Sequence, residues 1–420
     1  MSQSRLEHTP KKDTPSFNDR VCAKCMGHRS LCGVNPCPLL MRAKSLANLD
    51  TSLTGLDLIG SSPPSVFVGS YGYPKVLMGP LVPPIRGKEA ELMERPDLWL
   101  SKSLDQILSI RFKLVRTKSR LAIQEAIDPS RLLHDTQTLA LSEKPTDSDA
   151  TLLKRPQFTS VFSDRTLPIG PSAPLHKFRL EDNPSVPRKV DKVTSDTDYK
   201  AVLGVIDLFD EGIQQEHITR LLSVGLLGQK KSRKLVPTEW SITAVDDIVG
   251  KELHRRVLRM PWINDFYVFG DYALGNTVVI LFMPRAWQFE ALECWLYGKN
   301  SNVISDHEFS KGRTTYAKDV VGAYYATRLP ALEYLTRIRR QAGVLVFMEV
   351  NPEKWVPLGV WRFREIARRA LTRKPRKYST LDEAITEVSN YLSNPIENYL
   401  KVSSVYNEVR SQTVLTDFFE

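Results

Sequence analysis

Four of the five cysteines lie close together near the N-terminus, at Cys22, Cys25, Cys32 and Cys37. A Cys-x2-Cys pair followed by a second pair is a common ligand spacing of structural zinc, and four thiolates fill its tetrahedral shell. We therefore expect these thiolates to bind a structural Zn²⁺, with no position left open for chemistry. The proline after Cys37 also suits an iron–sulfur cluster, which is the alternative cofactor. The nearby His28 could replace one thiolate.

A second group with chemical potential is a histidine flanked by carboxylates, Asp306-His307-Glu308, with Arg313 shortly after it. Such a histidine can bind a divalent metal or act as a general base, and an arginine can hold a phosphate. Asp271 is a further weak catalytic candidate. This chemistry would suit a nuclease or an enzyme that processes a nucleotide or a DNA adduct, but polar loops also contain such triplets by chance. The sequence lacks a Gly-x-x-x-x-Gly-Lys-Ser/Thr loop, which disfavours ATP hydrolysis of that kind.

The third group is the C-terminal peptide that runs from Gln412 to Phe419. In a single tight turn Leu415 and Phe418 share one face, and Phe419 lies beside them. Such an apolar plug on a chain end can dock into a groove, while the Gln412 amide forms hydrogen bonds at the rim. The peptide matches the motif by which partner proteins bind the sliding clamp, PCNA. The alternative is a last amphipathic turn that folds back onto the protein's own core.

An amphipathic helix is predicted over residues 360–374. Its inner stripe is apolar (Phe363, Ile366, Ala370 and Leu371), and its basic side chains are expected to face mostly outward (Arg362, Arg364, Arg368, Arg369, Arg373 and Lys374). Few nearby acidic residues balance this charge. We therefore expect Arg364, Arg368, Arg369, Arg373 and Lys374 to contact nucleic-acid phosphates. The alternative is a basic face that is simply solvated.

The elements that must position these residues are a mixture of helices and apolar strands. Strands are expected at 65–69, 76–80, 240–243, 262–269, 277–282 and 344–350. Helices are expected at 89–93, 101–120, 199–209, 214–225 and 320–342. Two more are expected: one that follows Pro284 and includes Trp287, Ala291 and Trp295, and one that begins at the capping box of Thr380 and Glu383. Residues 300–313 read as a polar loop. This mixture predicts a mixed-sheet body of the α/β or α+β class.

The predicted organisation has four parts. They are a mobile N-terminus with the zinc module (1–42), an α/β region with an irregular Pro/Ser-rich stretch (43–197), a second α/β region (198–400) and a short tail with the clamp motif (401–420). Within the third part, two helices, a basic connector at 229–234 and the strand at 240–243 resemble a winged helix, which would place the connector near phosphates. Core helices joined by a solvated loop are the alternative.

The composition is consistent with a polyanionic partner. The 420 residues carry a formal net charge of +10, and 42% of them are hydrophobic. A basic chain of this kind suits DNA. No run of eighteen apolar residues and no secretory signal is found, so we expect a cytoplasmic, nucleoid-associated protein without membrane contact. The sequence does not indicate an oligomeric state.

Several motifs, in their order along the chain, resemble the archaeal Nre family of PCNA-interacting DNA repair proteins. They are the cysteine cluster (22–37), Gly-Ser-Tyr-Gly-Tyr-Pro (69–74), the segment 271–276, Gly-Arg-Thr-Thr-Tyr-Ala (312–317) and the clamp peptide (412–419). The matching pieces span nearly the whole chain. The resemblance implies a role in the response to DNA damage through the sliding clamp, and it implies no settled reaction.

Overall fold

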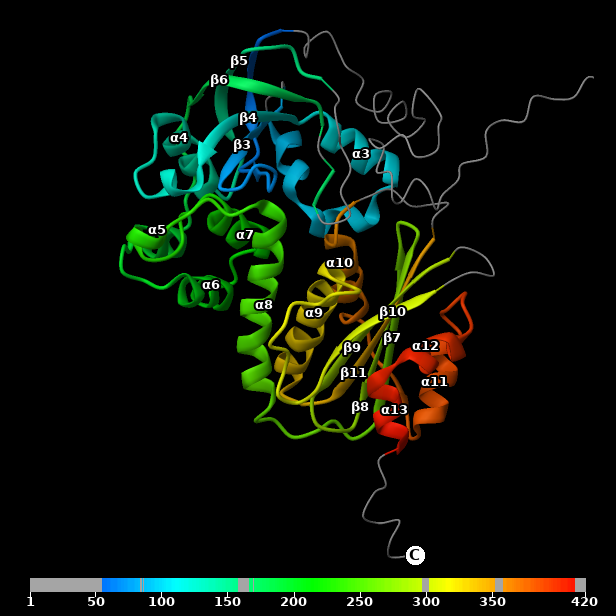
Figure 1. The fold of residues 1–420 in the computed structure, drawn as a ribbon. Helices are drawn as coiled ribbons and strands as arrows, with labels where there is room; N and C mark the ends of the chain where they lie inside the picture. Colours follow the sequence, from blue (N-terminus) through cyan, green and yellow to red (C-terminus); the bar gives the residue numbers. More distant parts are fainter. Residues whose placement is uncertain are drawn as a thin grey trace, which may run out of the picture.

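A computed structural model describes residues 55–411, apart from positions 84, 86, 158–165, 169, 297–301 and 352–357. The four cysteines and the C-terminal peptide lie outside the described residues. Two six-stranded mixed sheets, each with helices packed against it, are joined by a helical segment (Figure 1). The predicted mixture of helices and mixed sheets is confirmed.

The first sheet has the strand order β1-β5-β6-β4-β3-β2. Only β4 and β6 pair in parallel, and the other neighbours are antiparallel. Helix α4 covers one face through Leu139, which packs among apolar residues of the strands. The elements of this part are β1 (Asp57–Ser62), β2 (Val66–Val68), β3 (Lys75–Val82), η2 (Lys88–Glu94), η3 (Pro96–Ser101), α3 (Leu104–Phe112), β4 (Val115–Ala122), η4 (Ile123–Ala126), α4 (Arg131–Leu141), β5 (Thr146–Leu152) and β6 (Ser172–Leu180).

The strands expected at 65–69 and 76–80 are confirmed by β2 and β3, but the long helix expected at 101–120 is wrong in its second half. Helix α3 ends at Phe112, and the chain continues as strand β4. In β4 every second side chain at its start, Val115 and Thr117, is buried, while Arg116 and Lys118 between them are only partly so. This alternation is the period of a strand with one face on the core.

A helical segment connects the two sheets. It contains α5 (Arg188–Ser195), α6 (Ala201–Asp210), α7 (Gln215–Ser223), η5 (Lys230–Ser232) and α8 (Thr238–Val257). Helices α6 and α7 confirm the helices expected at 199–209 and 214–225. The winged-helix interpretation is wrong, because residues 240–243 lie in the first turns of α8 rather than in a strand. Buried apolar residues recur every fourth position along α8, at Val245, Val249, Leu253 and Val257, which is helical spacing.

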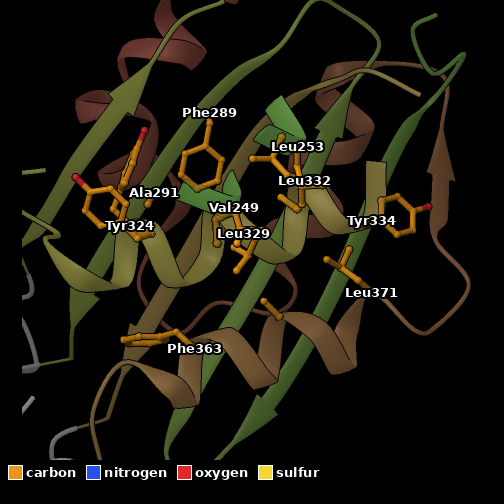
Figure 2. Packing of buried hydrophobic residues seen from close by; sticks show 14 of the residues in the cluster. Val249, Leu253, Phe289, Ala291, Tyr324, Leu329, Leu332, Tyr334, Phe363 and Leu371 are labelled. Atoms are coloured by element: carbon orange, nitrogen blue, oxygen red, sulfur yellow. The ribbon is translucent and has the colours of Figure 1, made fainter. Parts of the chain in front are cut away.

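The second sheet has the order β10-β9-β11-β8-β7-β12 and is covered on both faces. Helices α8, α9 and α10 build the larger core on one face (Figure 2), and α11, α12 and α13 pack on the other. The elements are β7 (Phe266–Ala273), β8 (Asn276–Met283), β9 (Gln288–Trp295), β10 (Val303–Glu308), α9 (Gly322–Ile338), β11 (Gly343–Val350), α10 (Trp361–Ala370), β12 (Arg376–Tyr378), α11 (Leu381–Ser389), α12 (Ile396–Val402) and α13 (Ser404–Ser411).

Two expectations for this half are wrong. The helix expected after Pro284 is the strand β9, and the polar loop expected at 300–313 contains the strand β10. Strand β9 is buried on both faces between β10 and β11. Because it contains the buried Glu290 and Glu293, its sequence neither alternates along its whole length nor forms the continuous apolar run typical of such a strand. The strand expected at 344–350 is confirmed by β11. Within the described residues, no helix is long and apolar enough to cross a membrane.

Candidate functional site

A polar pocket of about 330 Å³ lies beside strand β10, between helices α8 and α9 and the segment that follows β10. It contains Glu308 and Arg313 of the predicted catalytic group, whereas Asp306, His307 and Asp271 do not line it. The pocket also includes most of the Gly-Arg-Thr-Thr-Tyr-Ala motif. Its lining consists of Asp247, Lys251, His254, Glu308, Lys311, Gly312, Arg313, Thr314, Thr315, Tyr316, Tyr324, Tyr325 and Arg328.

Asp306 organises the loop that leads into helix α9. Its carboxylate accepts hydrogen bonds from the backbone N–H groups of residues 318, 319 and 320, at 3.1, 2.8 and 2.8 Å. An Arg313 Nη2 lies 2.8 Å from the Asp306 Oδ1. Burial alone would raise the pKa of Asp306, but the three backbone donors and Arg313 lower it below its ordinary value. A carboxylate held in this way is a structural anchor rather than a general base.

The three residues of the predicted triplet do not converge on one point. Asp306 and Glu308 are buried, while His307 between them projects to the other face of β10 and lies against Phe309, with ring centroids 5.2 Å apart. The expectation that these residues act together from an exposed loop is therefore wrong. The strand alternation separates the histidine from the two carboxylates.

Arg313 is also largely occupied within the protein. Besides Asp306, its guanidinium donates to the backbone carbonyls of Thr315 at 2.9 Å, His307 at 3.1 Å and Tyr316 at 3.2 Å. These bonds fix the segment 313–316 along one wall of the pocket. Arg313 therefore shapes the pocket, and few of its donors are left for a phosphate.

A buried ion pair forms the base of the pocket. Glu308 Oε1 accepts from Arg328 Nε at 2.7 Å and from Trp287 Nε1 at 2.9 Å. Both charged side chains are almost completely buried. A buried pair of this kind needs close mutual geometry to offset the cost of desolvation, and the indole N–H supplies an additional bond to the carboxylate.

Three buried polar atoms around this pair, His254 Nε2, Tyr324 Oη and Arg328 Nη1, form no well-aligned hydrogen bond within the described residues, although the nearby Glu308 carboxylate can accept from the Tyr324 hydroxyl. All three side chains are more than nine-tenths buried, and all three line the pocket. Buried polar groups are nearly always satisfied, so such atoms suggest a missing partner. A ligand or water in the pocket could supply it.

The surroundings of His254 favour its neutral form, which is the form that a general base requires. Burial, followed by the nearby Arg328 charge, lowers the pKa of His254, although the Glu308 charge and then a hydrogen bond with the Ser310 backbone act in the opposite direction. Because Nε2 is the unpartnered nitrogen, we assign the Ser310 bond to Nδ1–H, which leaves a lone pair on Nε2. The pocket can thus combine a neutral imidazole base with two donors, the Tyr324 hydroxyl and the Arg328 guanidinium.

Sequence reasoning missed the three central residues, although one signal was present. Tyr324 and Arg328 stand four positions apart in α9, so they share a face of a helix that is buried almost throughout. A buried arginine in such a helix indicates a specific partner. His254 gave no comparable signal, because α8 was not recognised as one long helix.

Helix α10 confirms its expected inner stripe but not its expected outer face. Arg362 and Arg364 are buried, so the expectation that they point outward is wrong. Arg364 Nη2 donates to Asp246 Oδ2 at 2.6 Å and its Nη1 lies 3.4 Å from a Glu216 oxygen. Lys374, beyond the helix end, is exposed.

Arg368 and Arg369 of this helix, and Arg373 just after it, are exposed in part but are held by carboxylates. Arg368 forms two hydrogen bonds with Glu333, at 2.7 and 3.0 Å. Arg369 and Arg373 both bind Asp271, at 2.5 and 2.9 Å. Asp271 thus belongs to this network rather than to the pocket. The expectation that little acid balances α10 is wrong, because the partners come from other elements.

Within the described residues, no group of three or more His, Cys, Asp or Glu side chains could hold a metal ion. The predicted zinc ligands and the clamp-binding residues lie outside this part of the chain.

Comparison with known proteins gives consistent matches over most of the length. Residues 31–300 match the family described as Archaeal Nre, N-terminal, and residues 308–418 match Archaeal Nre, C-terminal. The chain is 35% identical over 399 residues to DNA repair protein NreB of Archaeoglobus fulgidus, with 94% of this chain and 98% of that protein covered. It is 35% identical over 403 residues to DNA repair protein NreA of the same organism, with 95% and 98% covered. It is 31% identical over 382 residues to DNA repair protein NreA of Haloferax volcanii, with 88% and 90% covered. No solved structure matches.

Proposed function

Because this chain belongs to the archaeal Nre family, we propose that it is a DNA repair protein recruited to the sliding clamp by its C-terminal peptide. The names of the relatives support the repair role. The sequence from Gln412 to Phe419 is the observation that carries the recruitment, because it matches the clamp-binding motif at each defined position.

The position of the motif on the folded body supports this proposal. Helix α13 packs against the second sheet through the buried Val405 and ends at the exposed Ser411. The motif begins at the next residue. A recognition peptide joined to an exposed helix end can reach a partner without rearrangement of the body.

The proposal is tested by replacing the two aromatic residues of the motif, Phe418→Ala and Phe419→Ala, in the full chain. Calorimetry with the purified clamp should show loss of measurable binding, because these rings supply most of the apolar plug. A matched variant at undefined motif positions, Thr413→Ala with Asp417→Ala, should retain affinity. Equal clamp affinity of the aromatic variant and the wild-type chain would refute recruitment by this peptide.

We also propose that Cys22, Cys25, Cys32 and Cys37 bind a structural zinc ion. Four thiolates with this spacing would fold a small module around the metal. Metal analysis of the purified protein should give about one zinc per chain. A brown protein that contains iron would instead support the iron–sulfur alternative.

A second candidate function is phosphoester or adduct hydrolysis in the pocket at β10. The unpartnered His254 Nε2, beside the Tyr324 hydroxyl and Arg328, favours it. In this hypothesis Nε2 takes a proton from an attacking water, and the two donors stabilise the charge that develops on the substrate oxygen.

Two histidines on neighbouring elements allow a matched test of this second function. His254→Gln should abolish turnover of damaged or nicked DNA substrates, whereas His307→Gln should retain it because His307 lies outside the pocket. If both variants cleave at the wild-type rate, the pocket is not the active site.

A further inference from the structure

Strand β4 carries three cations at alternate positions: Arg116, Lys118 and Arg120. Alternate residues of a strand point to the same face, about 6.6–6.8 Å apart. In the described part of the chain, none of the three forms an ion pair with a carboxylate. Their neighbours across the sheet carry no negative charge: they are Ser172 and Pro174 on β6, and Leu77 and Leu81 on β3.

Arg116 and Lys118 are held in place by uncharged groups. The guanidinium of Arg116 lies 3.7 Å from the ring centroid of Phe67, and Lys118 Nζ donates to Ser172 Oγ at 2.7 Å. Burial lowers the pKa of Arg116 to about 10. Burial, and then the charge of Arg116, lowers the pKa of Lys118. A cation desolvated without an opposite charge is costly, and a bound anion would offset that cost.

Exposed aromatic rings lie on the loop before β3, which approaches Arg120 at Gly72, and on the first turn of α8. Tyr71 is 89% exposed, Tyr73 is 47% exposed and Trp240 is 43% exposed. The rings of Tyr73 and Trp240 lie 5.3 Å apart between centroids. This loop contains the Gly-Ser-Tyr-Gly-Tyr-Pro motif, for which neither the clamp peptide nor the pocket provides a role.

Gly72 explains how the loop can lie so close to β4. Its φ of +84° is in the region that favours glycine, and a Cβ there would meet the Lys75 backbone oxygen at 2.9 Å. The same Cβ would lie 3.5 Å from Arg120 Nη2. Because Gly72 has no side chain, the loop can lie close to the Arg120 guanidinium.

We propose that this β4 surface, made of Arg116, Lys118, Arg120, Tyr71, Tyr73 and Trp240, binds single-stranded DNA. A row of cations can follow phosphates, and exposed rings can stack on bases that have no pairing partner. In a duplex the bases are already stacked, so the aromatic rings would add little. The inference rests on the DNA-directed role proposed above, but it concerns a surface separate from the clamp peptide and from the pocket at β10.

The test measures binding of the full chain to a short fluorescent oligonucleotide over a series of salt concentrations. Lys118→Ala with Arg120→Ala should weaken binding and flatten the plot of log affinity against log salt by about 1.4, since each single-strand phosphate contact contributes about 0.7. Tyr71→Ala should weaken single-strand binding about tenfold and leave duplex binding unchanged. Tyr71 is suitable because its side chain is almost fully exposed, so the fold should tolerate the change.

A charge-matched variant separates this surface from a general electrostatic effect. Lys192→Ala with Lys401→Ala removes two exposed cations elsewhere and should leave the salt slope near that of the wild type. Equal slopes for the two double variants, or equal single-strand affinity of Tyr71→Ala and the wild type, would overturn the proposal. Clamp affinity, measured on the same variants, should be unchanged. The DNA-binding proposal and the clamp-recruitment proposal can therefore be refuted separately.

Discussion

Helix α10 and strand β4 are both rich in cations, yet the structure uses them differently. In α10, Arg364 binds Asp246, Arg368 binds Glu333 and Arg369 binds Asp271, all through carboxylates. In β4 no such partner is found within the described residues. The first set of charges stabilises the packing of helices on the second sheet, and the second set is available to an external anion.

The difference shows that density of positive charge along a sequence does not identify a nucleic-acid surface. The carboxylate of Asp246 is 118 residues from Arg364, and that of Asp271 is 98 residues from Arg369. These partners are brought together only by the tertiary fold. Conversely, the residues of β3 and β6 that face the three β4 cations are uncharged, which the local sequence of β4 cannot reveal.

The largest expected effect is on stability, and it appears when an arginine is replaced by methionine in each of the two regions. Arg364→Met leaves Asp246 buried without its partner and should reduce the free energy of unfolding by about 3–5 kcal/mol. Arg116→Met removes a half-buried cation that leaves no carboxylate behind, so the free energy of unfolding should change by less than about 1 kcal/mol. Urea denaturation of the two variants measures the difference.

Two further results would sharpen this contrast. Replacing Asp246 by Leu in the Arg364→Met background should restore much of the lost stability, because no charge then remains buried. Single-stranded DNA affinity should fall in Arg116→Met. A loss above about 3 kcal/mol in Arg116→Met would mean that its cation is part of the fold rather than a free charge.

The second prediction concerns a substitution that would leave cations near α10 without a carboxylate partner, as the cations of β4 are. Asp271→Asn removes the carboxylate that holds Arg369 and Arg373, which should cost about 1.5–3 kcal/mol of stability. Because both arginines are partly exposed, the freed charges should also strengthen non-specific DNA binding several-fold and steepen its salt dependence. Filter binding at two salt concentrations measures this. Unchanged DNA affinity in a folded Asp271→Asn variant would show that an unpaired cation alone is insufficient.

Much of the fold could be predicted from the sequence where periodicity is strong. The apolar run 344–350 and the inner stripe of α10 were read correctly, because burial fixed their pattern. The helix expected in place of strand β9 is wrong, since the buried Glu290 and Glu293 interrupt both the alternation and the apolar run that would mark a strand. The helix expected at 101–120 includes most of strand β4, because the many polar residues of β4 obscure the alternation of its buried positions, Val115 and Thr117.

The sequence predicted only two of the residues that line the candidate pocket. Glu308 and Arg313 were identified, but His254 and Arg328 come from two helices distant in sequence, and the packing of α8 against α9 brings them together. The expected roles of Asp306 and His307 failed for a local reason. In an extended strand, neighbouring side chains point to opposite faces, whereas the sequence alone had suggested a loop.

The smallest expected effect is a pH dependence confined to the α10 network. Burial raises the pKa of Glu365 from 4.5 to about 7, although Arg368, with its Nη1 2.9 Å away, opposes this. The folded protein therefore holds this proton more tightly than the unfolded chain. The stability that it contributes is present below about pH 4.5 and is lost as pH rises toward 7.

Glu365→Gln removes the titrating group, so the variant should lack this decline. Relative to the variant, the wild type should lose on the order of 1 kcal/mol between about pH 5 and about pH 7.5. Urea denaturation at the two pH values measures it. Arg120→Gln on β4 is the control, because that substitution removes no carboxylate and should leave the wild-type pH dependence in place. If the stability of Glu365→Gln falls with pH in parallel with the wild type, the carboxyl is not protonated in the folded network, and the arginines of α10 neutralise it fully.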